Sequence, residues 1–219
     1  MGVISLVGTL HQERGRVNSF ELDDILRKIL PEVIFIEAPA SIKDVSSWLS
    51  KAKPTESLAI SKYLDHHAAK IVPVDLLINE DSYLRNPREV IGYVEKVSGK
   101  YCQLFDQDKI NMIDGGFAYL NSEPYQEIKQ QMDGEIQRIL GLRKCPSLDK
   151  AYSSWLCDDE RREIEMLSNI ELYCRQNSFE RAVFLVGAAH RASIVSKSMA
   201  HSKSGQTNLQ WDYSSGWCA

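Results

Sequence analysis

Short apolar runs alternate along the chain with longer segments in which apolar residues recur every three or four positions. The runs at 3–7, 33–36, 71–74 and 182–186 are rich in β-branched residues and end at a glycine or a polar residue, which is typical of buried strands. The segments between them have the spacing of helices. Strands separated by helices predict an α/β fold with a mainly parallel central sheet and helices on both of its faces.

The ends of the predicted elements are marked with different clarity. Asn18 can cap the first helix, and Pro31 ends it because proline cannot continue a helix. Pro73 places the third strand at an edge of the sheet or at a bulge. The pair Gly115-Gly116 predicts a turn or mobile loop. Further helices are expected over 42–50, 55–69, 87–104, 124–140, 158–176 and from the last strand to about 200, with a late edge strand over 208–213.

Length and composition favour one domain spanning 1–219. A chain of 219 residues with 43% hydrophobic and 26% charged residues can bury an adequate core. No segment approaches the ~20 apolar residues of a membrane span, and the N-terminus lacks the features of a secretion signal. The five cysteines form no C-x-x-C pair, which favours reduced thiols. We therefore expect a cytoplasmic protein with no membrane contact.

The charge pattern gives little support to nucleic-acid binding. The formal net charge is −4, and basic residues are interspersed with acidic ones. A protein that binds the phosphate backbone usually has a basic face. No nucleic-acid partner is expected, and the sequence leaves the oligomeric state open.

One motif occurs near both ends of the chain. Leu6-Val7-Gly8 is followed three residues later by His11, and Leu185-Val186-Gly187 by His190. Each motif closes a predicted strand, and a glycine there permits a sharp exit and a close approach of the backbone to a ligand. Only a folded chain could bring the two histidines together, so the repeat predicts that both face one pocket.

Four chemically active side chains follow four predicted strands. These are His11, Glu37, Asp75 and His190. In parallel sheets, ligands bind beyond the carboxyl ends of the strands, so the four residues are expected at one edge. Two imidazoles with one or two carboxylates could hold zinc, manganese, iron or cobalt, and the ion could activate water. The same residues could act without a metal, with one histidine as general base and a carboxylate fixing its tautomer.

Each of these residues also has a structural interpretation. His11 and His190 could each bond a backbone group at a strand end. Glu37 could be an ordinary helix cap, and Asp75 has about equal claims to a structural and a functional role.

At these residues the chain resembles the superfamily that includes TraB/PrgY proteins, TIKI metalloproteases, erythromycin esterase-like enzymes and ChaN-like haem-binding lipoproteins. The resemblance rests on Gly8-Thr9-Leu10-His11, on Glu37 after an apolar strand, and on Gly187-Ala188-Ala189-His190, in that order. It implies an α/β core with a site formed by paired histidines and an acidic residue. Such a site is used for metal-dependent peptide cleavage in TIKI proteins and for ester hydrolysis in the esterases.

The resemblance also implies a basic residue on the helix before the last strand. Arg161 or Arg162 occupies that region, and a guanidinium there could hold a carboxylate, a phosphate or an oxyanion. The structural alternative pairs Arg161 with Glu165, and Arg162 with Asp158 or Asp159, on a solvated helix. The third strand ends in Pro-Val-Asp without the Arg-Asp pair of some relatives, which leaves the role of Asp75 open.

Taken together, these features favour a hydrolase of a peptide or ester bond, centred on His11, Glu37, His190 and Arg162, with a small-molecule or peptide substrate. The main alternative is a binding or sensor protein that holds a metal, haem or a small anion without turnover. A further alternative is an accessory component of a bacterial defence or toxin system. Members of the superfamily differ most in substrate, so the resemblance does not supply one.

Overall fold

The computed structural model describes residues 2–51, 55–78, 80–203, 209–214 and 216. Within these residues a sheet of five parallel strands has the order β3-β2-β4-β1-β5. The predicted α/β class is therefore confirmed. The strands are β1 (Val3–Thr9), β2 (Val33–Pro39), β3 (Lys70–Asp75), β4 (Arg181–Gly187) and β5 (Gln210–Asp212).

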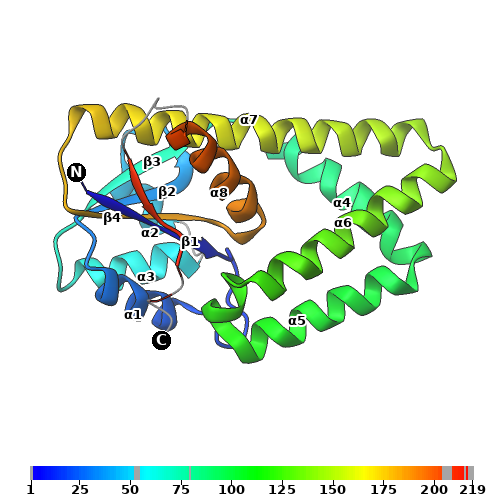
Figure 1. Cartoon of the computed structure of the whole chain (residues 1–219), viewed down its shortest axis with the longest axis horizontal. Coiled ribbons are helices and arrows are strands. Elements are labelled where there is room, and N and C mark those ends of the chain that lie inside the picture. The colour runs from blue at the N-terminus through cyan, green and yellow to red at the C-terminus, as the bar shows by residue number, and fades with distance from the viewer. Residues whose placement is uncertain (1, 52–54, 79, 204–208, 215, 217–219) are drawn as a thin grey trace.

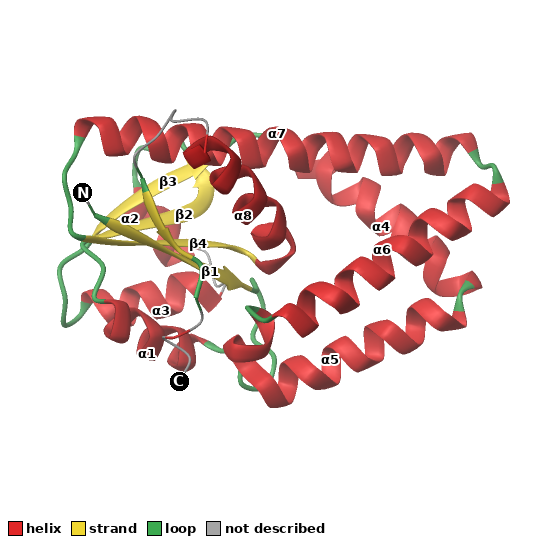
Figure 2. Ribbon diagram, viewed as in Figure 1, coloured by secondary structure: helices red, strands yellow, loops and turns green. Residues whose placement is uncertain are grey.

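Helices pack on both faces of this sheet (Figures 1 and 2). Helices α1 and α3 lie on one face, and α8 with the C-terminal half of α7 lies on the other. The eight helices of the described residues are α1 (Ser19–Ile29), α2 (Val45–Lys51), α3 (Thr55–Leu64), α4 (Glu80–Val97), α5 (Gly99–Leu120), α6 (Glu123–Arg143), α7 (Pro146–Gln176) and α8 (Ala188–Lys203).

The alternation of side chains along β4 explains this two-sided packing. Ala182, Phe184 and Val186 belong to the apolar cluster under α7 and α8, whereas Val183 and Leu185 belong to the cluster under α1 and α3. Successive side chains on a strand point to opposite faces, so a continuous apolar run is required where both faces are covered. The central position of β4, between β2 and β1, is consistent with its uninterrupted apolar sequence.

A third apolar cluster lies away from the sheet, in what we call the helical arm: α4, α5, α6 and the N-terminal half of α7 (Figure 1). Its buried residues include Val90, Val94, Tyr101 and Ile136. The helix α7 runs through both regions, because Leu148 and Ala151 pack in the arm while residues further along the helix pack on the sheet. The arm is inserted between β3 and β4 and extends beyond the strand ends.

Several predicted boundaries were confirmed. The Asn18 side chain accepts hydrogen bonds from the backbone N–H groups of Phe20 and Glu21, both at 3.0 Å, and so caps α1. In the described sheet β3 pairs only with β2, as the proline at position 73 predicted, and a late edge strand, β5, pairs with β1.

Other predictions were wrong at the ends of helices. The segment expected as one helix over 87–104 is divided between α4 and α5, where Ser98 caps the second helix. The helix expected from position 158 begins at Pro146, because it extends into the arm. The helix expected to reach position 69 ends at Leu64. None of the described helices is long and apolar enough to cross a membrane.

The Gly115-Gly116 pair does not form the expected turn or loop. Both residues lie inside α5, where Gly116 has φ 57° and ψ −145° and bends the helix. A side chain at Gly116 would meet the Glu21 carboxylate as well as strain the backbone. The next residue, Phe117, is fully buried, so this segment anchors α5 against the sheet.

Candidate functional site

The carboxyl ends of β2, β3 and β4 converge on one buried group of charged side chains. Glu37 lies on β2, Asp75 is the last residue of β3, and His190 lies in the first turn of α8 directly after β4. Arg162 and Glu163 reach the same place from α7. We call these five residues the Arg162 network. The side chain of each is more than nine-tenths buried.

Arg162 lies at the centre of this network. Its Nε donates to both carboxylate oxygens of Asp75, at 3.2 and 3.1 Å, and its Nη2 donates to Asp75 Oδ2 at 2.6 Å. The same Nη2 donates to Glu37 Oε1 at 2.5 Å, and Nη1 lies 3.3 Å from His190 Nε2. A planar guanidinium with several donors suits this arrangement, in which one cation joins two carboxylates and an imidazole.

Glu37 is held from a second direction by the strand that precedes His190. The backbone N–H of Gly187 donates to Glu37 Oε2 at 2.5 Å. A side chain at this glycine would come 3.1 Å from the same oxygen, so glycine lets the carboxylate approach the backbone. Burial raises the pKa of Glu37, but the charges of His190 and Arg162 and this backbone bond outweigh it and lower the pKa overall.

His190 forms a buried pair with a carboxylate of α7. Its Nδ1 lies 2.7 Å from Glu163 Oε1, and the other oxygen of Glu163 accepts from Ser193 at 2.5 Å and from Lys197 at 2.7 Å. Burial raises the pKa of Glu163, but these hydrogen bonds lower it to about 2 overall. Burial lowers the pKa of His190, but the bond to Glu163 and the charge of Glu37 raise it overall.

His11 has a more open environment. It lies in the loop between β1 and α1, and its side chain is 64% exposed, compared with 8% for His190. Its Nδ1 lies 3.2 Å from Glu56 Oε1, an oxygen that also accepts a hydrogen bond from the Thr9 hydroxyl at 2.7 Å. The bond to Glu56 raises the pKa of His11 to about 9 against the effect of burial.

The two motif histidines act on the same carboxylate. The charges of His190 and of His11 both lower the pKa of Glu37, so both imidazoles lie within electrostatic reach of it. His190 Nε2 is 3.9 Å from Glu37 Oε1. Four of the residues predicted from the sequence therefore lie in direct contact through Arg162: Glu37, Asp75, His190 and Arg162 itself. His11 pairs with Glu56 instead, and its positive charge lowers the pKa of Glu37.

The structure distinguishes the two candidate arginines. Arg162 is buried in the network, where it pairs with the carboxylates of Glu37 and Asp75 at the ends of two strands. The Arg161 side chain is 62% exposed, and its Nη1 lies 3.8 Å from Asp158 Oδ1. Its ion-pair partner is therefore Asp158 and not Glu165, the partner that the solvated-helix interpretation gave it. Because the donors of Arg162 face Glu37, Asp75 and His190, its position suits the alignment of these side chains more than the capture of a free oxyanion.

The expected metal ligands surround the guanidinium instead. Glu37, Asp75 and His190, three of the four predicted donors, each contact Arg162. Among the described residues there is no group of three or more His, Cys, Asp or Glu side chains that could hold an ion. The residues therefore do not fit a metal while Arg162 lies between them.

Three residues at or beside the site were not identified from the sequence. Glu163 follows Arg162 on α7, and because adjacent helical residues point about 100° apart, the two side chains reach different partners. Glu56 lies in the first turn of α3, and nothing in its local sequence links it to His11. A third such residue, Asn121, bonds both the N–H and the C=O of Gly8 at the end of β1.

Comparison with known proteins adds no family to this geometry. No family model, no curated protein and no solved structure matches the chain. Function is therefore inferred from the side chains at the strand ends.

Proposed function

We propose that this protein is a hydrolase of a peptide or ester bond, in which histidines transfer the protons and no metal is required. The observation that carries the proposal is the His190–Glu163 pair at 2.7 Å, placed beside Glu37 and Arg162 at the strand ends. A histidine oriented by a carboxylate is a common form of general base. The resemblance to the TraB, TIKI and erythromycin esterase-like superfamily is part of this proposal.

His190 is the proposed general base. Arginine can only donate hydrogen bonds, so the contact between Arg162 Nη1 and His190 Nε2 requires Nε2 to accept, and the ring proton then lies on Nδ1 and bonds Glu163. Nε2 has a single lone pair, so in this proposal a water molecule first displaces Arg162 Nη1 from it and then gives its proton to Nε2. The hydroxide formed attacks the carbonyl carbon of the substrate, and Glu163 stabilises the imidazolium that results.

His11 is the proposed general acid. Its pKa of about 9 keeps the imidazole protonated at neutral pH, and its exposed side chain is accessible to a substrate. When the tetrahedral intermediate collapses, the bond from carbon to the leaving oxygen or nitrogen breaks, and His11 donates a proton to that atom. Glu56, which bonds Nδ1 of His11, orients the ring for this transfer.

Arg162 acts through its neighbours. Its bonds to Glu37 and Asp75 hold two buried carboxylates beside His190 that would otherwise repel each other. With the guanidinium in place, Glu37 stays ionised and orients the backbone of Gly187 at the entrance to α8.

These assignments predict a bell-shaped dependence of kcat/KM on pH. The base form of His190 is required, so the rate rises as the pH passes its pKa, which lies above the ordinary value. The acid form of His11 is also required, so the rate falls above about pH 9. Glu56→Gln should move the alkaline limb to lower pH, because the bond to Glu56 is the main cause of the high pKa.

Turnover of p-nitrophenyl ester and chromogenic peptide panels would test the proposal. We expect His190→Ala to lower kcat by about 10²- to 10⁴-fold, and His11→Ala to lower it by a smaller factor within that range. His66→Ala, which changes an exposed histidine of the segment after α3, is the control and should leave turnover unchanged. Full activity in both His190→Ala and His11→Ala would exclude the assignment.

Elemental analysis of protein purified without a metal-affinity tag tests the metal-free form of the proposal. We expect no stoichiometric transition metal and no loss of activity in chelator. A metal present at one equivalent, and lost in both His11→Ala and His190→Ala, would replace the metal-free mechanism by the metal-dependent one.

A further inference from the structure

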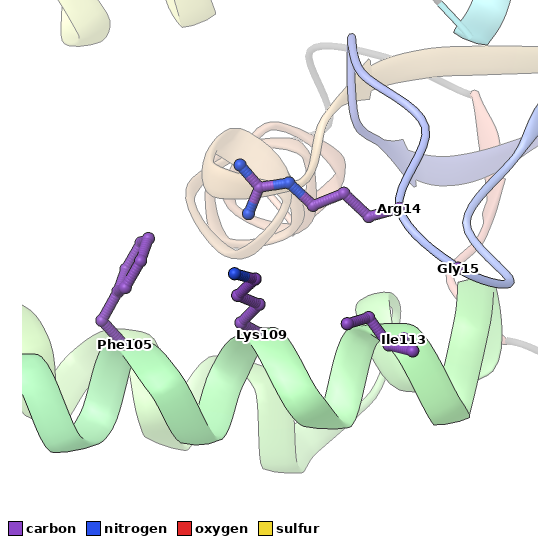
Figure 3. A pocket seen from close by; sticks show the side chains of 5 residues that line it. All are labelled: Arg14, Gly15, Phe105, Lys109 and Ile113. Atoms are coloured by element: carbon purple, nitrogen blue, oxygen red, sulfur yellow. The ribbon is translucent and has the colours of Figure 1, made fainter.

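A hollow of about 310 Å³ lies between the loop after β1 and the helix α5 of the arm (Figure 3). The loop is the one that carries His11. The hollow is lined by two basic side chains, one aromatic and one aliphatic side chain, and a glycine: Arg14, Lys109, Phe105, Ile113 and Gly15.

The walls of the hollow are held in place by contacts between the loop and α5. The backbone N–H of Arg16 donates to the carbonyl of Ile113 at 3.2 Å. Gly15 has φ +56°, and a Cβ atom on it would come 2.7 Å from both the Cα and the carbonyl oxygen of Ile113. Only glycine permits so close an approach in this backbone conformation, so the loop is fitted to the helix at this point.

The helix wall presents a single stripe of side chains. Phe105, Lys109 and Ile113 are spaced by four residues and therefore lie along one face of α5. Figure 3 shows the Arg14 side chain extending from the loop over this face, above Lys109 and toward Phe105. The two cationic groups thus face the same space, next to an aromatic ring and an aliphatic side chain.

The charges of this hollow are not balanced within the described part of the chain. No acidic residue lines it, and the side chains of Arg14 and Lys109 have no hydrogen bond or ion pair with any described residue. Nearby cations differ in this respect, since Arg16 pairs with Glu21 at 3.0 Å and Lys129 with Asp108 at 2.7 Å. Two like charges around one space favour an anion between them, and a carboxylate or phosphate accepts hydrogen bonds from both.

We propose that this hollow binds the anionic end of the substrate, a carboxylate or phosphate joined to an apolar group that packs on Phe105 and Ile113. The proposal rests on the proposed function, because it assigns the ligand to the substrate through the loop that Arg14 shares with His11. It places substrate recognition on the arm and the loop, and the chemistry on the strand ends.

Calorimetric titration of the full chain at low ionic strength tests the ligand class without requiring turnover. The probes are 4-phenylbutyrate, phenyl phosphate and the neutral 4-phenylbutanol. We expect one or both anions to bind at least about tenfold more tightly than the alcohol, and to bind more weakly as salt is added. Preference for 4-phenylbutyrate identifies a carboxylate site and preference for phenyl phosphate a phosphate site. Equal binding of all three probes, or binding of none, overturns the proposal.

Charge-neutralising variants locate the binding. Arg14→Gln and Lys109→Gln should each weaken anion binding by about tenfold or more, with little change in the affinity for the alcohol. The double variant Lys100→Gln/Arg143→Gln removes two exposed cations elsewhere on the arm and serves as the matched control. Anion binding that is as weak in the control as in the Arg14 and Lys109 variants overturns the proposal.

The titration and the turnover assay separate the two proposals. Anion binding lost in the Arg14 and Lys109 variants, together with no turnover of any ester or peptide, supports the binding site and contradicts the hydrolase. Turnover that depends on His190 but is equal for charged and neutral substrates supports the hydrolase and overturns the assignment of this hollow.

Discussion

The two histidines that end the same sequence motif have very different surroundings. β4 passes directly into α8, so His190 lies in the first turn of a helix and is buried against α7. β1 ends at Thr9 and is followed by a loop, so His11 lies at the surface. The motif places a histidine just beyond a parallel strand, but the element that follows decides how much of the side chain meets solvent.

This difference in burial gives the two imidazoles different electrostatic roles. His190 is enclosed by Glu163, Glu37 and Arg162 in a buried network. His11 has one carboxylate partner, Glu56, and is open to water on its other side. The proposed division into a buried base and an exposed acid follows from this contrast.

Arg162→Met tests whether the buried region depends on its central cation. Removal of the guanidinium leaves the carboxylates of Glu37 and Asp75 buried without the cation that pairs with both, which should lower the free energy of unfolding by about 3–5 kcal/mol. Urea denaturation measures this loss. Arg161→Met removes the same charge from the exposed side of α7 and should change stability by less than about 0.5 kcal/mol. Equal effects of the two substitutions would contradict the network.

The pH dependence of stability tests the carboxylate that holds His190. The pKa of Glu163 in the folded protein, about 2, is below its ordinary value of 4.5. Its stabilisation is therefore complete above pH 4.5 and is lost as the pH falls toward 2. The shift corresponds to about 3 kcal/mol at most.

Glu163→Gln should remove this part of the slope of unfolding free energy against pH. Glu160→Gln is the control, because Glu160 bonds the same Lys197 at 2.7 Å but is exposed. An unchanged slope in Glu163→Gln would show that the carboxylate is not stabilised as described.

Asn121→Ala tests how the arm holds the end of β1, from which the His11 loop starts. The Asn121 side chain accepts from the Gly8 N–H at 2.6 Å and donates to the Gly8 carbonyl at 3.0 Å. Its removal leaves both backbone groups buried without these partners and should cost about 1–3 kcal/mol in thermal or urea denaturation. The control is Gln130→Ala, which removes an exposed side-chain amide from α6 and should leave the free energy of unfolding almost unchanged. A similarly small effect of Asn121→Ala would mean that the link between α5 and β1 is not stabilising.

The titration of His11 gives the smallest and most local effect. Proton NMR of the imidazole should give a midpoint near pH 9, and Glu56→Gln should move it toward the ordinary value of 6.5. Glu127→Gln changes an exposed glutamate of α6 and should leave the midpoint in place. A midpoint near 6.5 in the unsubstituted protein would rule out the Glu56 bond and the role of His11 as an acid that is protonated at neutral pH.

Local sequence patterns were enough to predict the class of the fold and the positions of the strand-end residues. Both depend on local patterns: apolar runs make strands, and in a parallel sheet every strand ends at the same edge. His11, Glu37, Asp75 and His190 could therefore be placed at that edge from the sequence alone. The ends of helices in the arm and the bend at Gly116 could not, since contacts between distant helices decide them.

Which of these side chains contact each other, and which charges surround them, depends on how the helices pack around the sheet. Arg162 comes to Glu37 and Asp75 from a helix far along the chain, and the pairing of Glu56 with His11 depends on how α3 packs beside β1. An electrostatic partner is chosen by distance in space and by exclusion of water, and neither quantity is contained in a local sequence pattern. For this reason the two histidines look equivalent in the sequence motif. In the folded chain His190 is buried and pairs with Glu163, whereas His11 is exposed and pairs with Glu56.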